Sequence, residues 1–169
     1  MPVTGIQSAT SNFLNTTIKR NEIKEVIFVD SINIPAGNAS WDVSALQDSS
    51  VMVWYDTASL SPYVITIEGE GIVEGNLNSN YLFESLINVT KLDLTHFDTL
   101  KVTNMSSVFR NMYRLTNLDL RKVDFSLVTS YDYMLSFVPT TAKITVKDAT
   151  ARAWLNSRFP EYTNILIAS

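Results

Sequence analysis

The chain has 169 residues, of which 46% are hydrophobic, and its formal net charge is −4. This composition favours one folded domain over a disordered chain, and the acidic balance argues against a nucleic-acid binder, which would carry a basic stripe. The chain contains no cysteine, which excludes disulfides and thiolate metal sites. No apolar run approaches the ~20 residues that cross a bilayer, so membrane insertion is not expected.

Residues 1–22 are polar and predict an N-terminal arm that packs against another subunit rather than its own core. The first ten residues have no basic stretch followed by an apolar one, so we expect no signal peptide. If the chain is complete, this expectation favours a route to the exterior other than standard secretion, such as the release of phage structural proteins by lysis. The alternative is a trimmed chain from which a signal has been removed.

Residues 23–81 contain short apolar runs of strand type, divided by turn-forming stretches that contain proline and glycine. The runs are residues 26–29, 51–54 and 64–67. Their spacing is irregular, so we predict N-terminal capping strands rather than full repeats. The acidic stretch around Glu68, Glu70 and Glu74 matches no calcium-binding motif and is interpreted as a solvated turn.

Residues 82–147 repeat with a period of 26, which is the strongest signal in the sequence. The positions that coincide after this shift are apolar in every copy. They are Leu82, Val108 and Met134; Phe83, Phe109 and Leu135; Leu86, Met112 and Val138; Leu92, Leu118 and Ile144; and Leu94, Leu120 and Val146. The alternation in the last two sets predicts one strand per copy with one buried face.

The remainder of each copy has helical spacing. Met105, Phe109 and Met112 fall at i, i+4 and i+7, which predicts a short helix with one buried stripe. A single strand and helix cannot bury their apolar faces alone, but stacked copies can. We therefore predict an α/β solenoid with one parallel sheet and short helices on the opposite side.

Residues 148–169 predict a C-terminal cap. Asp148 is placed to cap a helix that runs through 149–158 with Ala151, Leu155 and Phe159 facing inward, and Pro160 would end it. Residues 164–167 read as a closing strand. Terminal segments that differ from the middle are required to cover an exposed solenoid core.

The blocks Leu92-Asp93-Leu94, Phe97-Asp98-Thr99 and Val102-Thr103-Asn104-Met105-Ser106 resemble the repeat of BspA-like leucine-rich-repeat bacterial surface proteins. The resemblance covers most of residues 23–169 and is most specific over 82–138. Apolar residues fill the family's cysteine position, and only two full copies and a partial third are present. The resemblance implies a leucine-rich-repeat fold and surface display with an adhesion or host-interaction role, and it implies no catalytic residues and no cofactor.

The outward side chains of the three predicted strands form rows of polar residues, because equal positions of adjacent strands lie ~4.8 Å apart. The rows are Lys91, Asn117 and Lys143; Asp93, Asp119 and Thr145; and Thr95, Arg121 and Lys147. Leucine-rich repeats commonly bind partners on this face, so we predict a binding surface there. The alternative interpretation is an ordinary solvated sheet face.

The sequence offers no catalytic or metal-ligating set. The single histidine, His96, has no nucleophile motif near it and is interpreted as a surface turn residue. Two functions remain. One is a non-enzymatic adhesion or recognition module for a cell-surface protein or glycan, displayed as a phage virion surface protein or as a secreted or cell-wall-displayed adhesin fragment. The other is a purely structural decoration subunit that docks on other virion subunits through residues 1–22.

Overall fold

The computed structural model of the protein describes residues 14, 17–44 and 48–169. Within this part, the chain forms a short 3-10 helix, ten strands and one α-helix. They are η1 (Arg20–Glu22), β1 (Ile23–Val29), β2 (Ala39–Asp42), β3 (Val51–Tyr55), β4 (Tyr63–Gly69), β5 (Val73–Glu74), β6 (Lys91–Asp93), β7 (Phe97–Asp98), β8 (Asn117–Leu120), β9 (Lys143–Val146), α1 (Ala149–Arg158) and β10 (Ile165–Ile167). The fold is mainly sheet.

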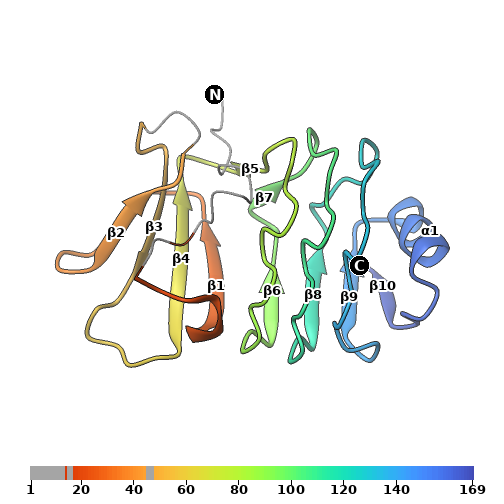
Figure 1. The fold of residues 1–169 in the computed structure, drawn as a ribbon. Helices are drawn as coiled ribbons and strands as arrows, with labels where there is room; N and C mark the ends of the chain where they lie inside the picture. Colours follow the sequence, from red (N-terminus) through yellow and green to blue (C-terminus); the bar gives the residue numbers. More distant parts are fainter. Residues whose placement is uncertain (1–13, 15–16, 45–47) are drawn as a thin grey trace.

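One large sheet runs the length of the molecule (Figure 1). Its eight described strands lie in the order β10-β9-β8-β6-β1-β4-β3-β2. Every pair from β10 to β4 is parallel, whereas β3 and β2 join through antiparallel pairs. Strands β5 and β7 form a second, two-stranded parallel sheet. The predicted α/β class with a mostly parallel sheet is confirmed.

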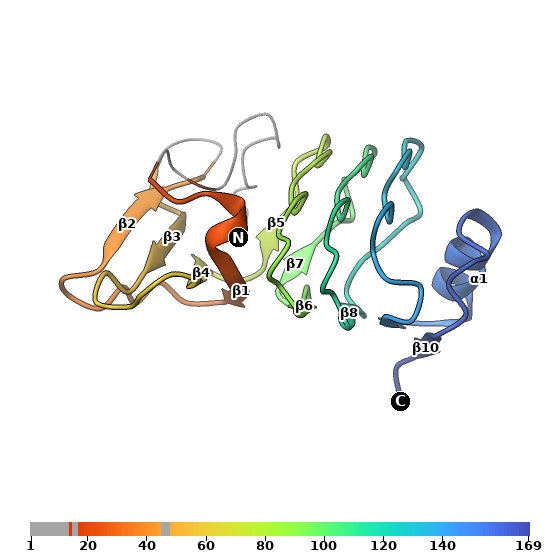
Figure 2. The ribbon, with the colours of Figure 1, turned by 60° about the horizontal axis from the view of Figure 1, so that its bottom comes forward.

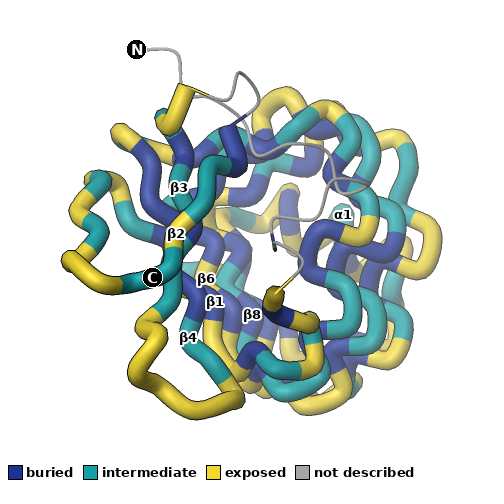
Figure 3. The backbone as a smooth tube through the Cα atoms, turned by 60° about the vertical axis from the view of Figure 1, so that its left-hand side comes forward, coloured by how far each residue is buried: buried dark blue, intermediate teal, exposed yellow. Residues whose placement is uncertain are grey.

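The core follows the 26-residue period. Leu92 of β6 pairs with Leu118 of β8, which pairs with Ile144 of β9, and all three are at most 1% exposed. Behind the strands, the rings of Phe83 and Phe109 stack with centroids 6.0 Å apart and an interplanar angle of 5°. The predicted register of the repeats is therefore confirmed, and Figure 3 shows the buried stretches gathered in the interior of the molecule.

The short helices predicted in the repeats are wrong, because the structure has turns there. In the middle copy, Val108 and Arg110 donate backbone N–H bonds to carbonyls three residues back, at Met105 and Ser107. The intervening Phe109 N–H donates across to Met134 of the next copy. A helix would use all these N–H groups internally. The turns instead build a second hydrogen-bond ladder between copies while keeping the apolar stripe buried.

The N-terminal strands continue the same sheet. The three apolar runs predicted there form β1, β3 and β4, and Val26 of β1 lies opposite Leu92 of β6. The interpretation of Glu68 as part of a solvated turn is wrong. This residue lies in β4, is 4% exposed, and accepts a hydrogen bond from the Asn33 backbone N–H at 2.7 Å. A chain segment between β1 and β2 therefore covers Glu68.

The predicted N-terminal arm falls largely outside the described residues, but its described end contradicts the expectation that it avoids its own core. Leu14 and Ile18 are buried in the main apolar cluster. The Arg20 guanidinium donates to the backbone carbonyls of Leu82 and Glu84 at 2.9 and 2.8 Å. These contacts hold the end of the segment against the first repeat.

The C-terminal cap forms as predicted. Asp148 accepts a hydrogen bond from the Ala151 backbone N–H at 2.8 Å and begins α1, which ends at Arg158 before Pro160. Trp154 of α1 stacks on Phe125 with centroids 4.5 Å apart, so the helix covers the open end of the core. In the described part of the chain, no helix is long and apolar enough to cross a membrane.

Candidate functional site

The structure brings the first two predicted rows together on the outward face of the sheet. Register pairs Lys91 with Asn117 and Asn117 with Lys143, and it aligns Asp93, Asp119 and Thr145 in the same way. All six side chains are exposed or half-buried, while their neighbours along each strand are buried. The alternation arises because successive strand residues point to opposite faces. We call these six residues the outward rows.

The two rows differ in their ties to the fold. Asp93 and Asp119 each accept a hydrogen bond from the backbone N–H two residues later, at 2.9 and 3.1 Å, and so close the turn that follows the strand. The side chains of Lys91 and Lys143 make no hydrogen bond or ion pair with any other described residue. We call Lys91, Asn117 and Lys143 the lysine row. Its two lysine side chains do not stabilise the fold through hydrogen bonds or ion pairs among the described residues.

The third predicted row does not stay together. Arg121 folds back on Asp119, with its Nη2 2.7 Å from the carboxylate Oδ2, and hydrogen bonding with this carboxylate raises the pKa of Arg121. Lys147 turns toward the end of the sheet, where its Nζ lies 2.6 Å from Asp124 Oδ2. Thr95 remains beside the outward rows and is half-buried. Periodicity aligned these backbones but could not show which partner each long side chain would choose.

Two shallow hollows lie along the outward rows. One, of about 430 Å³, is lined by Lys91, Asp93, Thr95 and His96 together with residues of β1. The other, of about 410 Å³, lies between Asp119, Arg121 and the C-terminal strand β10. Each hollow mixes charged groups with exposed apolar side chains of a neighbouring strand, Ile27 in β1 for the first and Leu166 and Ile167 in β10 for the second. These apolar side chains could not be predicted from the 26-residue period, because neither strand belongs to the repeat.

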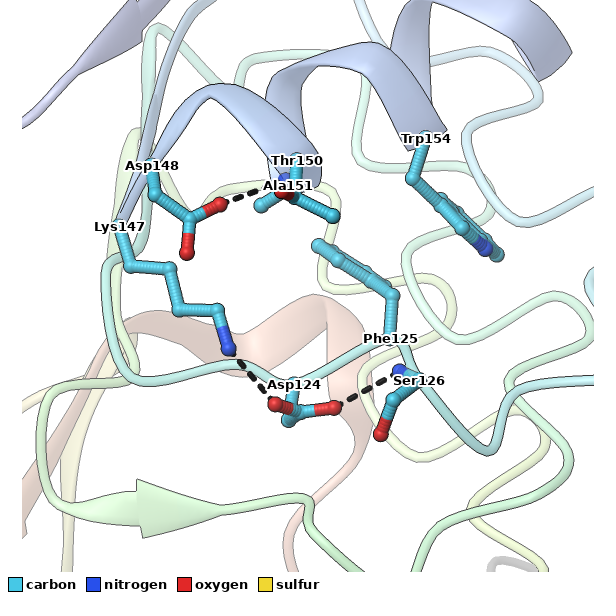
Figure 4. A pocket seen from close by; sticks show the side chains of 8 residues that line it. All are labelled: Asp124, Phe125, Ser126, Lys147, Asp148, Thr150, Ala151 and Trp154. Carbon is cyan, nitrogen blue, oxygen red and sulfur yellow. Dashed lines mark hydrogen bonds and ion pairs between the residues drawn. The ribbon is translucent and has the colours of Figure 1, made fainter.

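A smaller hollow of about 190 Å³ lies where α1 meets the last turn (Figure 4). Asp124 accepts from Lys147 Nζ and from the Ser126 backbone N–H, and these hydrogen bonds lower the pKa of Asp124 to about 2. The same hydrogen bond raises the pKa of Lys147. Phe125 and Trp154 form the apolar wall. Because the charges are already paired with each other, this hollow serves to fasten the cap.

His96 lies at the rim of the hollow beside β1, and its backbone carbonyl accepts from the Val73 N–H at 3.1 Å. Glu74 of β5 pairs with Lys101 at 3.0 Å. Among the described residues, no three histidine, cysteine, aspartate or glutamate side chains gather as metal ligands would.

Comparison with known proteins gives one match. Residues 73–146 match a family described as "Mycoplasma protein of unknown function, DUF285". Neither the curated proteins nor the solved structures contain a match to the chain. The matched range begins at β5, ends at the last residue of β9, and so contains all three repeat strands together with the turns between them.

Proposed function

We propose that this chain is a leucine-rich-repeat solenoid that acts as a non-enzymatic recognition module at the surface of a cell or particle. Three in-register parallel strands with a period of 26 residues support the solenoid. The sequence resemblance to BspA-like surface proteins supports surface display. Recognition of a cell-surface protein or glycan is the role that best suits this combination.

The observation that carries the proposal is the exposure of the lysine row without side-chain partners for its two lysines among the described residues. Lys91 and Lys143 project from the paired strands and are exposed, and their side chains make no hydrogen bond or ion pair with another described residue. The side chain of Asn117, which lies between them, makes one long hydrogen bond, in which its Nδ2 donates to Thr116 Oγ1 at 3.4 Å. Backbone pairing fixes the spacing of the three residues, and the two lysine charges can meet a partner without first breaking an ion pair within the fold, which favours specificity and a fast association.

The test uses the triple variant Lys91→Ala, Asn117→Ala and Lys143→Ala. The labelled wild-type protein is applied to an array of immobilised surface proteins and glycans, and the variant should lose at least about tenfold in affinity for the spots bound. The matched control is Lys122→Ala, Arg152→Ala and Asn156→Ala, which removes the same charge at exposed positions elsewhere. Equal loss in both variants would show a nonspecific charge effect, and no loss in either would exclude this face as the site.

A further inference from the structure

A second surface, separate from the outward rows, lies on the turns of the last two copies. It consists of Arg110, Tyr113, Tyr133 and Phe137, which we call the aromatic cluster. The three rings are 54%, 68% and 62% exposed. Tyr113 and Phe137 have centroids 6.0 Å apart, and the Arg110 guanidinium lies 5.9 Å from the Tyr133 centroid. In Figure 2 these turns form the top edge of the coils, while β6 and β8 lie at the bottom.

The backbone beneath two of these rings is strained. Tyr133 and Phe137 have φ values of +58° and +63°, in the left-handed region that bulky residues rarely occupy. The same conformation recurs at the equivalent positions of both preceding copies, which hold Tyr81 and Ser85 in the first and Ser107 and Asn111 in the second, so the third copy alone has aromatic residues at both positions. Asparagine tolerates the left-handed region well. Two aromatic residues at such positions, pointing to solvent, serve neither the backbone nor the core, and such outliers gather at functional sites.

Polar groups surround the rings. Arg110, Tyr133, Ser136 and Phe137 line a hollow of about 640 Å³. The Arg110 charge is opposed by Glu84, with Nη1 3.6 Å from Oε1, and the Arg110 Nε has no acceptor among the described residues. The Nε is itself buried, so the donors that face the hollow are the guanidinium Nη groups of a side chain that is 39% exposed. The hollow therefore offers ring faces, a hydroxyl and guanidinium N–H donors, with little net charge.

This combination matches the chemistry of a sugar. A pyranose ring presents polarised C–H groups on one face, which pack on the electron-rich face of an aromatic ring, and hydroxyls at its edge, which accept from N–H donors. The balance of Arg110 by Glu84 favours a neutral sugar over an acidic one.

The size of the surface also favours a small ligand over a protein. At about 200 Å² per aromatic side chain, the exposed fractions amount to roughly 370 Å² of ring surface. A stable protein interface needs about 800 Å² on each partner. The residues beside the rings are small or polar, such as Ser106, Asn111 and Ser136.

We propose that the aromatic cluster binds a neutral oligosaccharide of two or three pyranose units. The rings of Tyr133 and Phe137 stack on the sugar faces, and Arg110 donates to a hydroxyl. This site is independent of the outward rows, so it can be present whether or not those rows bind a partner.

The experiment uses a substitution that the chain itself supplies. The double variant Tyr133→Ser and Phe137→Asn gives the third copy the residues of the second, and these suit the left-handed backbone better. The variant should therefore melt at the wild-type temperature or above it. The control is Tyr81→Ser, which removes another exposed tyrosine at the equivalent position of the first copy, where φ is +60°.

Full-length wild type, variant and control are applied to an array of neutral and acidic oligosaccharides, and the strongest neutral trisaccharide is titrated by calorimetry. We expect binding by wild type and control, and a loss of at least about tenfold in the double variant. Saturation-transfer NMR on wild type should show contact from aromatic protons to the C–H groups of the sugar, a readout that is independent of the variant's stability.

Several results would overturn the proposal. One is the absence of binding to any neutral trisaccharide up to about 10 mM. Another is binding that survives the double variant, or binding confined to acidic sugars. Self-association of the wild type that the double variant abolishes would instead assign the cluster to a protein interface.

Discussion

The repeats and the N-terminal strands both contribute to one continuous sheet and core, but only the repeats have a periodic sequence. In the repeats, β6, β8 and β9 begin 26 residues apart and pair residue for residue, so each side chain stacks on its equivalent. In the N-terminal half, β1 lies between β6 and β4, and β3 and β2 run antiparallel. Continuous backbone pairing and a continuous core therefore do not require a periodic sequence, but a surface of equally spaced side chains does.

The largest expected effect tests whether both halves unfold together. Phe109 stacks on Phe83 in the repeats, and Ile67 is fully buried in β4. Phe109→Ala should cost about 3–5 kcal/mol and Ile67→Ala about 2–5 kcal/mol, because each leaves a cavity in a packed core. Calorimetry should show one shared transition at a lower temperature in both variants. Two separate transitions, of which each variant moves only one, would mean that the halves are separate domains.

The junction between the halves gives the next test. Gly75 follows β5, and a Cβ added there would lie 2.8 Å from Val102 Cγ2 and 3.0 Å from Phe97 Cζ. Gly75→Ala should therefore destabilise the protein by about 1–3 kcal/mol through overpacking, measured by urea unfolding. Gly37→Ala is not a suitable control because its φ is +88°, whereas Thr140→Ala changes an exposed turn residue and should have little effect. Equal stability of the Gly75 variant and wild type would contradict the close approach.

The C-terminal cap is fastened to the last repeat by Tyr162, whose hydroxyl lies 2.6 Å from the Leu135 carbonyl and 2.9 Å from that of Val138. Tyr162→Phe should cost about 1 kcal/mol. Burial raises the pKa of Tyr162 to about 12 from an ordinary value of 10. The protonated hydroxyl therefore stabilises the fold fully below pH 10, and this contribution is lost as pH rises toward 12. The destabilisation by Tyr162→Phe should shrink over that range, and a pH-independent difference would contradict this role.

The smallest effect concerns Asp124, whose pKa is lowered from 3.8 to about 2, chiefly by the hydrogen bond from Lys147. A lowered pKa stabilises the folded state above the ordinary value, and the benefit is lost as pH falls from about 4 to 2. Asp124→Asn should cost less than about 1 kcal/mol at pH 6 because the pair is near the surface, and nothing at pH 2. Thermal melts across this range, with Asp132→Asn as an exposed control, measure the difference. An Asp124→Asn effect that does not fade toward pH 2 would contradict the pairing.

The same contrast explains what could be predicted from sequence. Leu92, Leu118 and Ile144 were placed in one core because a strand's two-residue alternation recurred at a fixed period. The turns were predicted as helices because Met105, Phe109 and Met112 have a spacing that suits either structure. The turn differs from a helix in the hydrogen bond that the Phe109 N–H donates to the Met134 carbonyl of the next copy. Because this bond joins two copies, the spacing of apolar residues within one copy cannot predict it.

The candidate surfaces divide in the same way. The outward rows were predicted because strand pairing fixes them. The ion pair of Lys147 with Asp124 was not predicted, and neither were the positive φ values of Tyr133 and Phe137. Side-chain partners and turn dihedrals depend on three-dimensional packing. Phe137 did break the pattern set by Ser85 and Asn111 at the equivalent positions, and that was the available signal.

The central claim is that 26 residues form one structural unit, and duplication of residues 104–129 tests it most directly. The inserted copy would stack Phe109 on its own duplicate and add one strand to the sheet in register. Because the stability of stacked repeats grows with each matched interface, the longer protein should unfold cooperatively at or above the wild-type melting temperature, as followed by circular dichroism. Duplication of residues 104–125, which breaks the phase by four residues, should abolish the cooperative transition. If the two insertions behave alike, or if the 26-residue insertion alone unfolds the protein, the claim is contradicted.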